Sequence, residues 1–162
     1  GRAQAGELAA ELGAVELAAV YSSPLRRAIE TARVVAASHD LTPVALDGLR
    51  EVDVGSWQSL TRPEIEARFP EEFARWLDYE QGWSDGESYE EMGRRVVATL
   101  LELGAEHEGE QILAVTHGGP IRAAFAFADG SSHADARRLG PTIGNVFVAR
   151  FAVESAALRR LD

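Results

Sequence analysis

The sequence contains no cysteine. It also contains no lysine, since all 16 of its basic residues are arginine. Without cysteine, the chain has no thiolate nucleophile, no disulfide and no thiolate metal site. Without lysine, it lacks both the phosphate-binding lysine of a P-loop and the amine of Schiff-base catalysis. The sequence also has no Asp-x-Asp pair that would indicate an aspartyl-phosphate mechanism. These absences leave histidine, arginine and carboxylate side chains as the candidates for chemistry.

Acidic residues outnumber basic ones, and the formal net charge of the 162 residues is −10. This balance argues against binding to nucleic acid or to an anionic membrane. No apolar run approaches the roughly 18 residues that a membrane-spanning helix requires, and no signal peptide is visible, so we expect a cytoplasmic protein. The length and the 46% hydrophobic content fit a single domain over 1–162, and a homodimer is compatible with both.

The most informative stretch is Val115-Thr116-His117-Gly118-Gly119. It follows an apolar run at 111–115 that predicts a buried parallel strand, and it precedes a proline that suits the first turn of a helix. His117 is therefore expected at the carboxyl end of a strand, beside the free N–H groups of a helix N-terminus. Open α/β sheets place ligands there, and such N–H groups stabilise anions. The pattern favours a phosphate-binding histidine; the alternative is a histidine that only caps the helix.

A second candidate segment joins a predicted strand at 17–22 to a predicted helix at 25–38. Ser23-Pro24 ends the strand and starts the helix, which places Arg26 and Arg27 in the first helical turn. The helix dipole disfavours cations at that end, so an anionic ligand is one reason for their presence. The alternative is simple exposure to solvent, which we expect for Arg26 rather than for Arg27.

A third candidate segment, 49–58, mixes apolar and acidic residues without helical periodicity and is interrupted by a glycine. Neighbouring Leu49, Val52 and Val54 could partly desolvate the carboxylate of Glu51. Desolvation would raise its pKa toward the range that is useful for proton transfer. Asp53 is a rival on the same reasoning, and for both residues the alternative is a solvated loop charge.

Strands and helices alternate along the rest of the chain. Helices are expected at 2–12, 25–38, 62–78, 88–103 and 120–128, and strands at 17–22, 43–47, 111–116 and near 145–152. Ser88 and Glu91 form a capping box at the start of the fourth of these helices. Alternating β and α elements imply an α/β fold, with three layers in which helices cover both faces of a mostly parallel sheet.

Four motifs in order resemble the histidine phosphatase superfamily, also called the phosphoglycerate-mutase-like family. They are Ser22-Ser23-Pro24-Leu25-x-Arg27-Ala28-x-x-Thr31-Ala32, Leu49-x-Glu51-x-x-x-Gly55-x-Trp57-Gln58, Gly86-Glu87-Ser88 and Val115-Thr116-His117-Gly118-Gly119. The resemblance spans nearly the whole chain and implies a phosphatase acting on a small phosphorylated metabolite. Arg27, His117 and the N–H of Gly118 would then bind the phosphoryl group, and Glu51 would be the general acid. It implies no cofactor and no metal.

The family's Arg-His-Gly motif, whose histidine accepts the phosphoryl group at the end of a central first strand, is absent. None of the four histidines has that context, and we interpret all but His117 as surface residues: His39, His107 and His133. We therefore expect the missing strand and its histidine upstream of Gly1, in a segment that was removed or that another chain supplies. Losing such a strand forfeits roughly 5–10 kcal/mol, comparable with the stability of a domain. The 162 residues alone are expected to be marginally stable and inactive.

Two other functions stay open. A phosphoglycerate mutase is one, although mutases of the family usually carry a lysine shortly after the glutamate motif. The other is a non-catalytic phosphate-binding or interaction domain, if the histidine is truly absent. The resemblance also implies that the inserted region 56–87 covers the site as a lid and tunes substrate choice. Its three tryptophans either wall a substrate pocket or form a small separate core: Trp57, Trp76 and Trp83.

Overall fold

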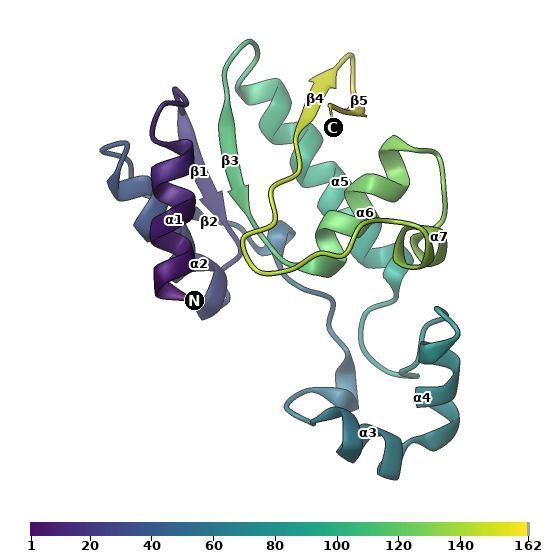
Figure 1. The fold of residues 1–162 in the computed structure, drawn as a ribbon. Helices are drawn as coiled ribbons and strands as arrows, with labels where there is room; N and C mark the ends of the chain where they lie inside the picture. The colour runs from purple at the N-terminus through teal and green to yellow at the C-terminus, as the bar shows by residue number, and fades with distance from the viewer. Residues whose placement is uncertain (162) are drawn as a thin grey trace.

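The computed structural model describes residues 1–161 and has helices on both sides of a small parallel sheet (Figure 1). The sheet contains β1 (Ala19–Ser22), β2 (Val44–Ala45) and β3 (Ile112–Val115) in the order β2-β1-β3. The α-helices are α1 (Arg2–Leu12), α2 (Arg26–Ala37), α3 (Arg62–Arg68), α4 (Pro70–Leu77), α5 (Tyr89–Glu106), α6 (Gly118–Ala128) and α7 (His133–Arg138). The predicted α/β class with a parallel sheet is confirmed.

Side chains alternate across β1 and connect the sheet to a helix on each face. Val20 is 1% exposed and packs against α2 through Ala32, whereas Tyr21 donates or accepts a 2.8 Å hydrogen bond with His107 at the end of α5. The paired residues of β1 and β3 run in parallel from Ala19 opposite Ile112 to Ser22 opposite Val115. Because all pairings in this sheet are parallel, the segments that follow β1 and β3 leave it at the same edge.

The last predicted strand, near 145–152, is wrong for most of its length. Residues 145–150 are irregular, and β4 (Phe151–Glu154) pairs antiparallel with β5 (Ala157–Arg160) in a separate two-stranded sheet. Ser155 and Ala156 form the hairpin turn with φ of 50° and 61°, as two-residue turns between antiparallel strands require. Within residues 1–161, β3 has a paired strand on one side only.

The inserted region forms a small lobe with its own core, visible below the sheet in Figure 1 as α3 and α4. Trp57, Ile65, Phe73 and Trp83 are all buried there, and Trp76 packs against them. The helical region predicted over 62–78 consists of two helices, divided at Phe69, whose φ of −135° is not helical. Pro70 begins α4 because proline, which lacks an N–H, is tolerated in a first helical turn but not inside a helix.

The short helix α7 was not predicted, because six residues carry too little periodicity to be recognised. Ser132 caps it by accepting a 3.0 Å hydrogen bond from the N–H of Asp135. Within residues 1–161 no helix combines the length and the apolar character that crossing a bilayer demands.

Candidate active site

Arg27 and His117 meet although 90 residues separate them in the sequence. Arg27 lies in the first turn of α2, just after β1, and its Nε donates a 3.1 Å hydrogen bond to Nδ1 of His117. The neighbouring Arg26 instead pairs with Glu30 at 2.8 Å, and its side chain is 88% exposed, as we expected from the sequence. The two arginines therefore differ because successive positions on a helix face different directions.

His117 lies two residues after the end of β3 and is the N-cap residue of α6, with 8% of its surface exposed. Because Nδ1 accepts from Arg27, the proton of the neutral ring belongs on Nε2, which lies 2.8 Å from Oγ of Ser23. Burial, followed by the charges of Arg27 and Arg50, lowers the pKa of His117 to about 4. The imidazole is therefore neutral at pH 7, with both nitrogens engaged.

Glu51 approaches the same helix N-terminus from the loop after the 3₁₀ turn Asp47–Leu49. Its Oε2 lies 3.4 Å from the backbone N of Gly119, and its Oε1 accepts a 3.0 Å hydrogen bond from the N–H of Val52. The loop is fixed to the end of β3, because Oγ1 of Thr116 donates a 2.6 Å hydrogen bond to the carbonyl of Leu49. The carboxylate is thereby held at the first turn of α6.

Asp53, the rival acid, is engaged in its own loop. Its Oδ1 accepts a 2.9 Å hydrogen bond from the N–H of Gly55 and a further one from the side-chain amide of Gln58. Arg95 of α5 also holds this loop, because its Nη1 donates hydrogen bonds to the carbonyls of Gly48 (2.9 Å) and Arg50 (3.1 Å). The carboxylate of Asp53 is thus hydrogen-bonded within its own loop, whereas the carboxylate of Glu51 lies at the first turn of α6.

A cleft of about 1060 Å³ joins this edge of the sheet to the inserted lobe. Arg27, Glu51 and Gly119 line it, while His117 and Gly118 lie directly behind them and are not part of its lining. The tryptophans Trp57, Trp76 and Trp83 line it as well. The interpretation as a small separate core is confirmed, and the same tryptophans also form a wall of the cleft.

Several lining residues had no role in the sequence-based site, among them Tyr89, Arg122, His133 and Arg137. Predicting His133 as a surface residue was wrong, because its ring stacks on that of Tyr89 with centroids 4.1 Å apart. His39 and His107 are half-buried too, so the surface interpretation fails for all three. Arg122 could have been recognised from the sequence as a candidate cleft residue. It is a lone charge in the otherwise apolar helix α6 and lies one turn after Gly118.

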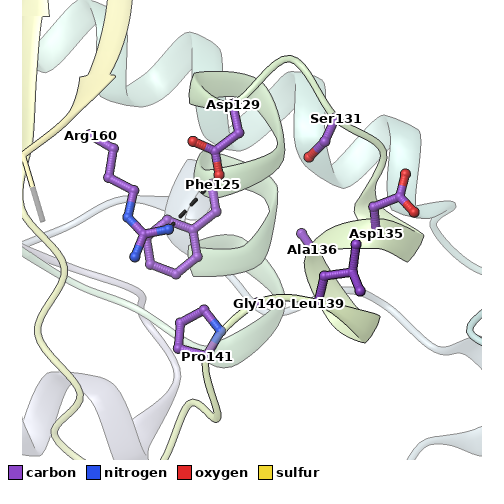
Figure 2. A pocket seen from close by; sticks show the side chains of 9 residues that line it. All are labelled: Phe125, Asp129, Ser131, Asp135, Ala136, Leu139, Gly140, Pro141 and Arg160. Atoms are coloured by element: carbon purple, nitrogen blue, oxygen red, sulfur yellow. Dashed lines mark ion pairs between the residues drawn. The ribbon is translucent and has the colours of Figure 1, made fainter.

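A second, smaller pocket of about 410 Å³ lies between α6, α7 and β5 (Figure 2). The guanidinium of Arg160 lies 4.1 Å from the ring centroid of Phe125 and pairs with Asp129 at 3.8 Å. None of the residues predicted as site residues lines this pocket. Within residues 1–161 no three histidine or acidic side chains are grouped as they would be around a metal ion.

Comparison with known protein families identifies the family of this chain. The family description "Histidine phosphatase superfamily (branch 1)" matches residues 1–162. The chain belongs to this superfamily.

Individual relatives of this superfamily chain are phosphatases and mutase-like proteins. Phosphoserine phosphatase 1 of Hydrogenobacter thermophilus is 33% identical over 127 residues, which cover 77% of this chain and 60% of that protein. Phosphoglycerate mutase-like protein 4 of Arabidopsis thaliana is 35% identical over 155 residues, which cover 91% of this chain and 66% of that protein. The chain thus spans about two thirds or less of the length of these curated relatives.

Solved structures of superfamily members superpose on nearly the whole chain. YhfR of Bacillus stearothermophilus matches with a TM-score of 0.92 and 28% identity, covering 99% of this chain and 80% of that one. A mycobacterial glucosyl-3-phosphoglycerate phosphatase in complex with VO3 matches with a TM-score of 0.84 and 28% identity, covering 99% and 81%. The irregular segment 145–150 and the separate β4–β5 sheet are thus compatible with the superfamily fold.

Proposed function

We propose that the complete protein is a phosphatase that hydrolyses a small phosphomonoester through a phosphohistidine intermediate. The observation that carries this proposal is the convergence of Arg27, His117 and Glu51 on the first turn of α6. A guanidinium, an imidazole and free helix N–H groups together suit a phosphoryl dianion. The carboxylate beside them suits an acid that acts on the ester oxygen.

The phosphoryl group would bind between Arg27 and His117 and replace the hydrogen bond that joins them. Arg27 Nε and the N–H of Gly118 would then donate to phosphoryl oxygens. The negative charge would offset the neighbouring arginines and raise the pKa of His117, so that the ring could donate too. Donors held in this way stabilise the charge that spreads over the oxygens in the transition state.

Two displacements at phosphorus complete the proposed reaction. A histidine nitrogen attacks in line, a P–N bond forms, and the P–O bond to the alcohol breaks while Glu51 gives its proton to the leaving oxygen. Water then attacks the phosphohistidine, the P–N bond breaks, and Glu51 takes a proton from that water. Free phosphate and the original carboxylic acid result, so Glu51 ends each turnover protonated as it began.

The attacking histidine is proposed to come from a segment preceding Gly1. Both nitrogens of His117 are engaged, and neither His39 nor His107 lines the cleft. His133 lines it, but is stacked on Tyr89 rather than placed beside Arg27. The unpaired edge of β3, next to His117, offers the place for a further strand that would carry the nucleophile.

The test uses the full-length protein and an activated ester, p-nitrophenyl phosphate. We expect hydrolysis, and an acid-labile phosphorylated histidine upstream of Gly1 after rapid quenching and peptide mass spectrometry. Arg27→Gln should abolish most of the turnover, whereas Arg26→Gln, the matched exposed neighbour, should not. Transfer of the phosphoryl group to a second hydroxyl instead of water would establish the mutase. Phosphate binding without turnover or phosphohistidine would establish the non-catalytic domain.

A further inference from the structure

Arg122, His133 and Arg137 line the same cleft as Arg27 and Glu51 but take no part in the phosphoryl chemistry proposed above. Arg122 comes from α6, and the other two are one turn apart on α7. Within residues 1–161 neither of these arginines forms an ion pair with a carboxylate. Acidic residues, Glu51 among them, also line the cleft, but among the described residues neither of these two positive charges is directly paired with a carboxylate.

Arg137 is fixed in place without losing its charge. Its guanidinium lies 5.2 Å from the ring centroid of Trp76 and 5.4 Å from that of Tyr89. Its terminal nitrogens donate to the carbonyls of Glu80 (3.1 Å) and Trp76 (3.0 Å). Carbonyl oxygens and aromatic faces orient a guanidinium but leave its net charge, so Arg137 contributes a fixed positive potential.

His133 presents a donor next to that potential. Burial, followed by the charges of Arg137 and Arg122, lowers its pKa to about 4, so the ring is neutral at pH 7. Its Nδ1 is sealed from solvent and has no partner. A proton on Nδ1 would be a buried N–H without an acceptor, which is costly, so the proton belongs on Nε2. Nε2 then carries an N–H for which the described residues provide no acceptor.

Arg122 adds a second unused donor close to the phosphoryl site. Its Nη1 donates a 3.2 Å hydrogen bond to the carbonyl of Gly118, while Nη2 has no protein partner within residues 1–161. Four residues separate Arg122 from Gly118, which is about one helical turn, or roughly 5.4 Å along the axis. Whatever Arg122 binds therefore lies near the phosphoryl group that Gly118 is proposed to hold.

We propose that Arg122 and His133, with the charge of Arg137 behind them, bind a carboxylate of the substrate. Two donors and an uncompensated positive potential match a planar anion with two oxygens better than the three oxygens of a second phosphate. The short separation from Gly118 requires the carboxylate to lie only a few bonds from the ester oxygen. This proposal rests on the phosphatase function and specifies its substrate class: small carboxylated phosphomonoesters.

The test compares O-phosphoserine with phosphoethanolamine, which differ only by the carboxylate, on the full-length protein. We expect the wild type to prefer phosphoserine in kcat/KM. Arg122→Gln should lower kcat/KM for phosphoserine by about 10- to 100-fold, the range for losing a hydrogen bond to a charged group, and should change phosphoethanolamine far less. Arg138→Gln removes a charge from α7, the helix that carries His133 and Arg137, but from an exposed side chain outside the cleft, and should change neither.

A second readout is independent of turnover. Tyr89, Arg122 and Arg137 are the titratable and charged groups that face His133. A bound carboxylate should raise the pKa of His133, measured by NMR, with phosphoserine but not with phosphoethanolamine. If p-nitrophenyl phosphate is not hydrolysed, the phosphatase function fails, and the NMR shift still decides the subsite. Equal losses on both esters in Arg122→Gln, an unshifted His133, or a stronger preference for a bisphosphate would each overturn the carboxylate assignment.

Discussion

Replacing Gly119 with alanine should disable the proposed acid without disturbing the fold. The added Cβ would overlap Oε1 of Glu51 and come within 3.2 Å of Sδ of Met92. Gly119 lies in the first turn of α6 without a positive φ, so its backbone accepts alanine. The carboxylate is the flexible end of a side chain and can move aside, which makes the overlap inexpensive for folding. The same movement takes it away from the N–H of Gly119.

The expected loss in kcat follows from that displacement. Misplacing a catalytic group by about 1 Å costs roughly 100-fold, and removing a general acid costs about 10²–10⁴-fold. We therefore expect kcat of Gly119→Ala in the full-length protein to fall about 100-fold on an alkyl phosphate. On p-nitrophenyl phosphate the fall should be much smaller, because that leaving oxygen needs little protonation. Alanine in a helix is favoured over glycine by up to about 1 kcal/mol, so the melting temperature should change little.

Gly93→Ala supplies the matched control for this variant. Gly93 lies in α5, and an added Cβ would meet only the Cβ of Ala123, at 3.8 Å. Its kcat should match the wild type on both esters. Full activity of Gly119→Ala on the alkyl phosphate would refute the position of Glu51 beside the leaving group. A large loss of thermal stability in Gly119→Ala would show instead that the carboxylate cannot move aside.

Three further outcomes are expected of the same full-length protein. Glu51→Gln should keep phosphate inhibition and slow the hydrolysis of alkyl esters by about 10²–10⁴-fold, with a smaller effect on p-nitrophenyl phosphate. His117→Ala should instead slow the hydrolysis of both kinds of ester and weaken phosphate inhibition. The folded pKa values of His117 and His133, about 4, lie below the ordinary histidine value of 6.5. The unfolded chain therefore binds more protons, so the free energy of unfolding should fall as pH drops from 6.5 to 4, and less so in His133→Phe. Arg95→Met breaks the 2.7 Å pair with Glu87, both partners being mostly buried, and should lower that free energy by about 1–3 kcal/mol in denaturant titrations.

Most of the fold was predictable because its elements repeat a strong local pattern. The helix 2–12 has the same bounds in the structure, and the predicted strands at 17–22 and 111–116 contain β1 and β3. The segment 145–150 was not predictable, although it has an apolar pattern like that of a strand. Val148 packs against the cluster of α1 and α2 instead of pairing in a sheet. Strand pairing depends on a partner far away in the sequence, and periodicity alone does not identify that partner.

The contact between Arg27 and His117 was predictable to a greater extent than the rest of the cleft. Arg27 and His117 both follow apolar strands, so parallel topology alone brings them to one edge of the sheet. His133 had no such signal, because a polar segment precedes it and its own helix has only six residues. Its place in the cleft depends on Tyr89 and Arg137, which come from separate elements. Short helices and long-range stacking are properties of the folded chain rather than of any sequence window.

An acidic protein that binds an anion must gather positive charge locally, and this chain does so with arginine alone. Arginine keeps its charge beside tryptophan and tyrosine rings, where burial would favour neutral lysine. The arginines also affect the neighbouring histidines. Burial and the arginine charges lower the pKa values of His117 and His133 to about 4. Both rings are therefore neutral at pH 7. If the chain binds a phosphorylated carboxylate as proposed, binding of that anion and uptake of protons by these rings should form one coupled equilibrium, since each would favour the other.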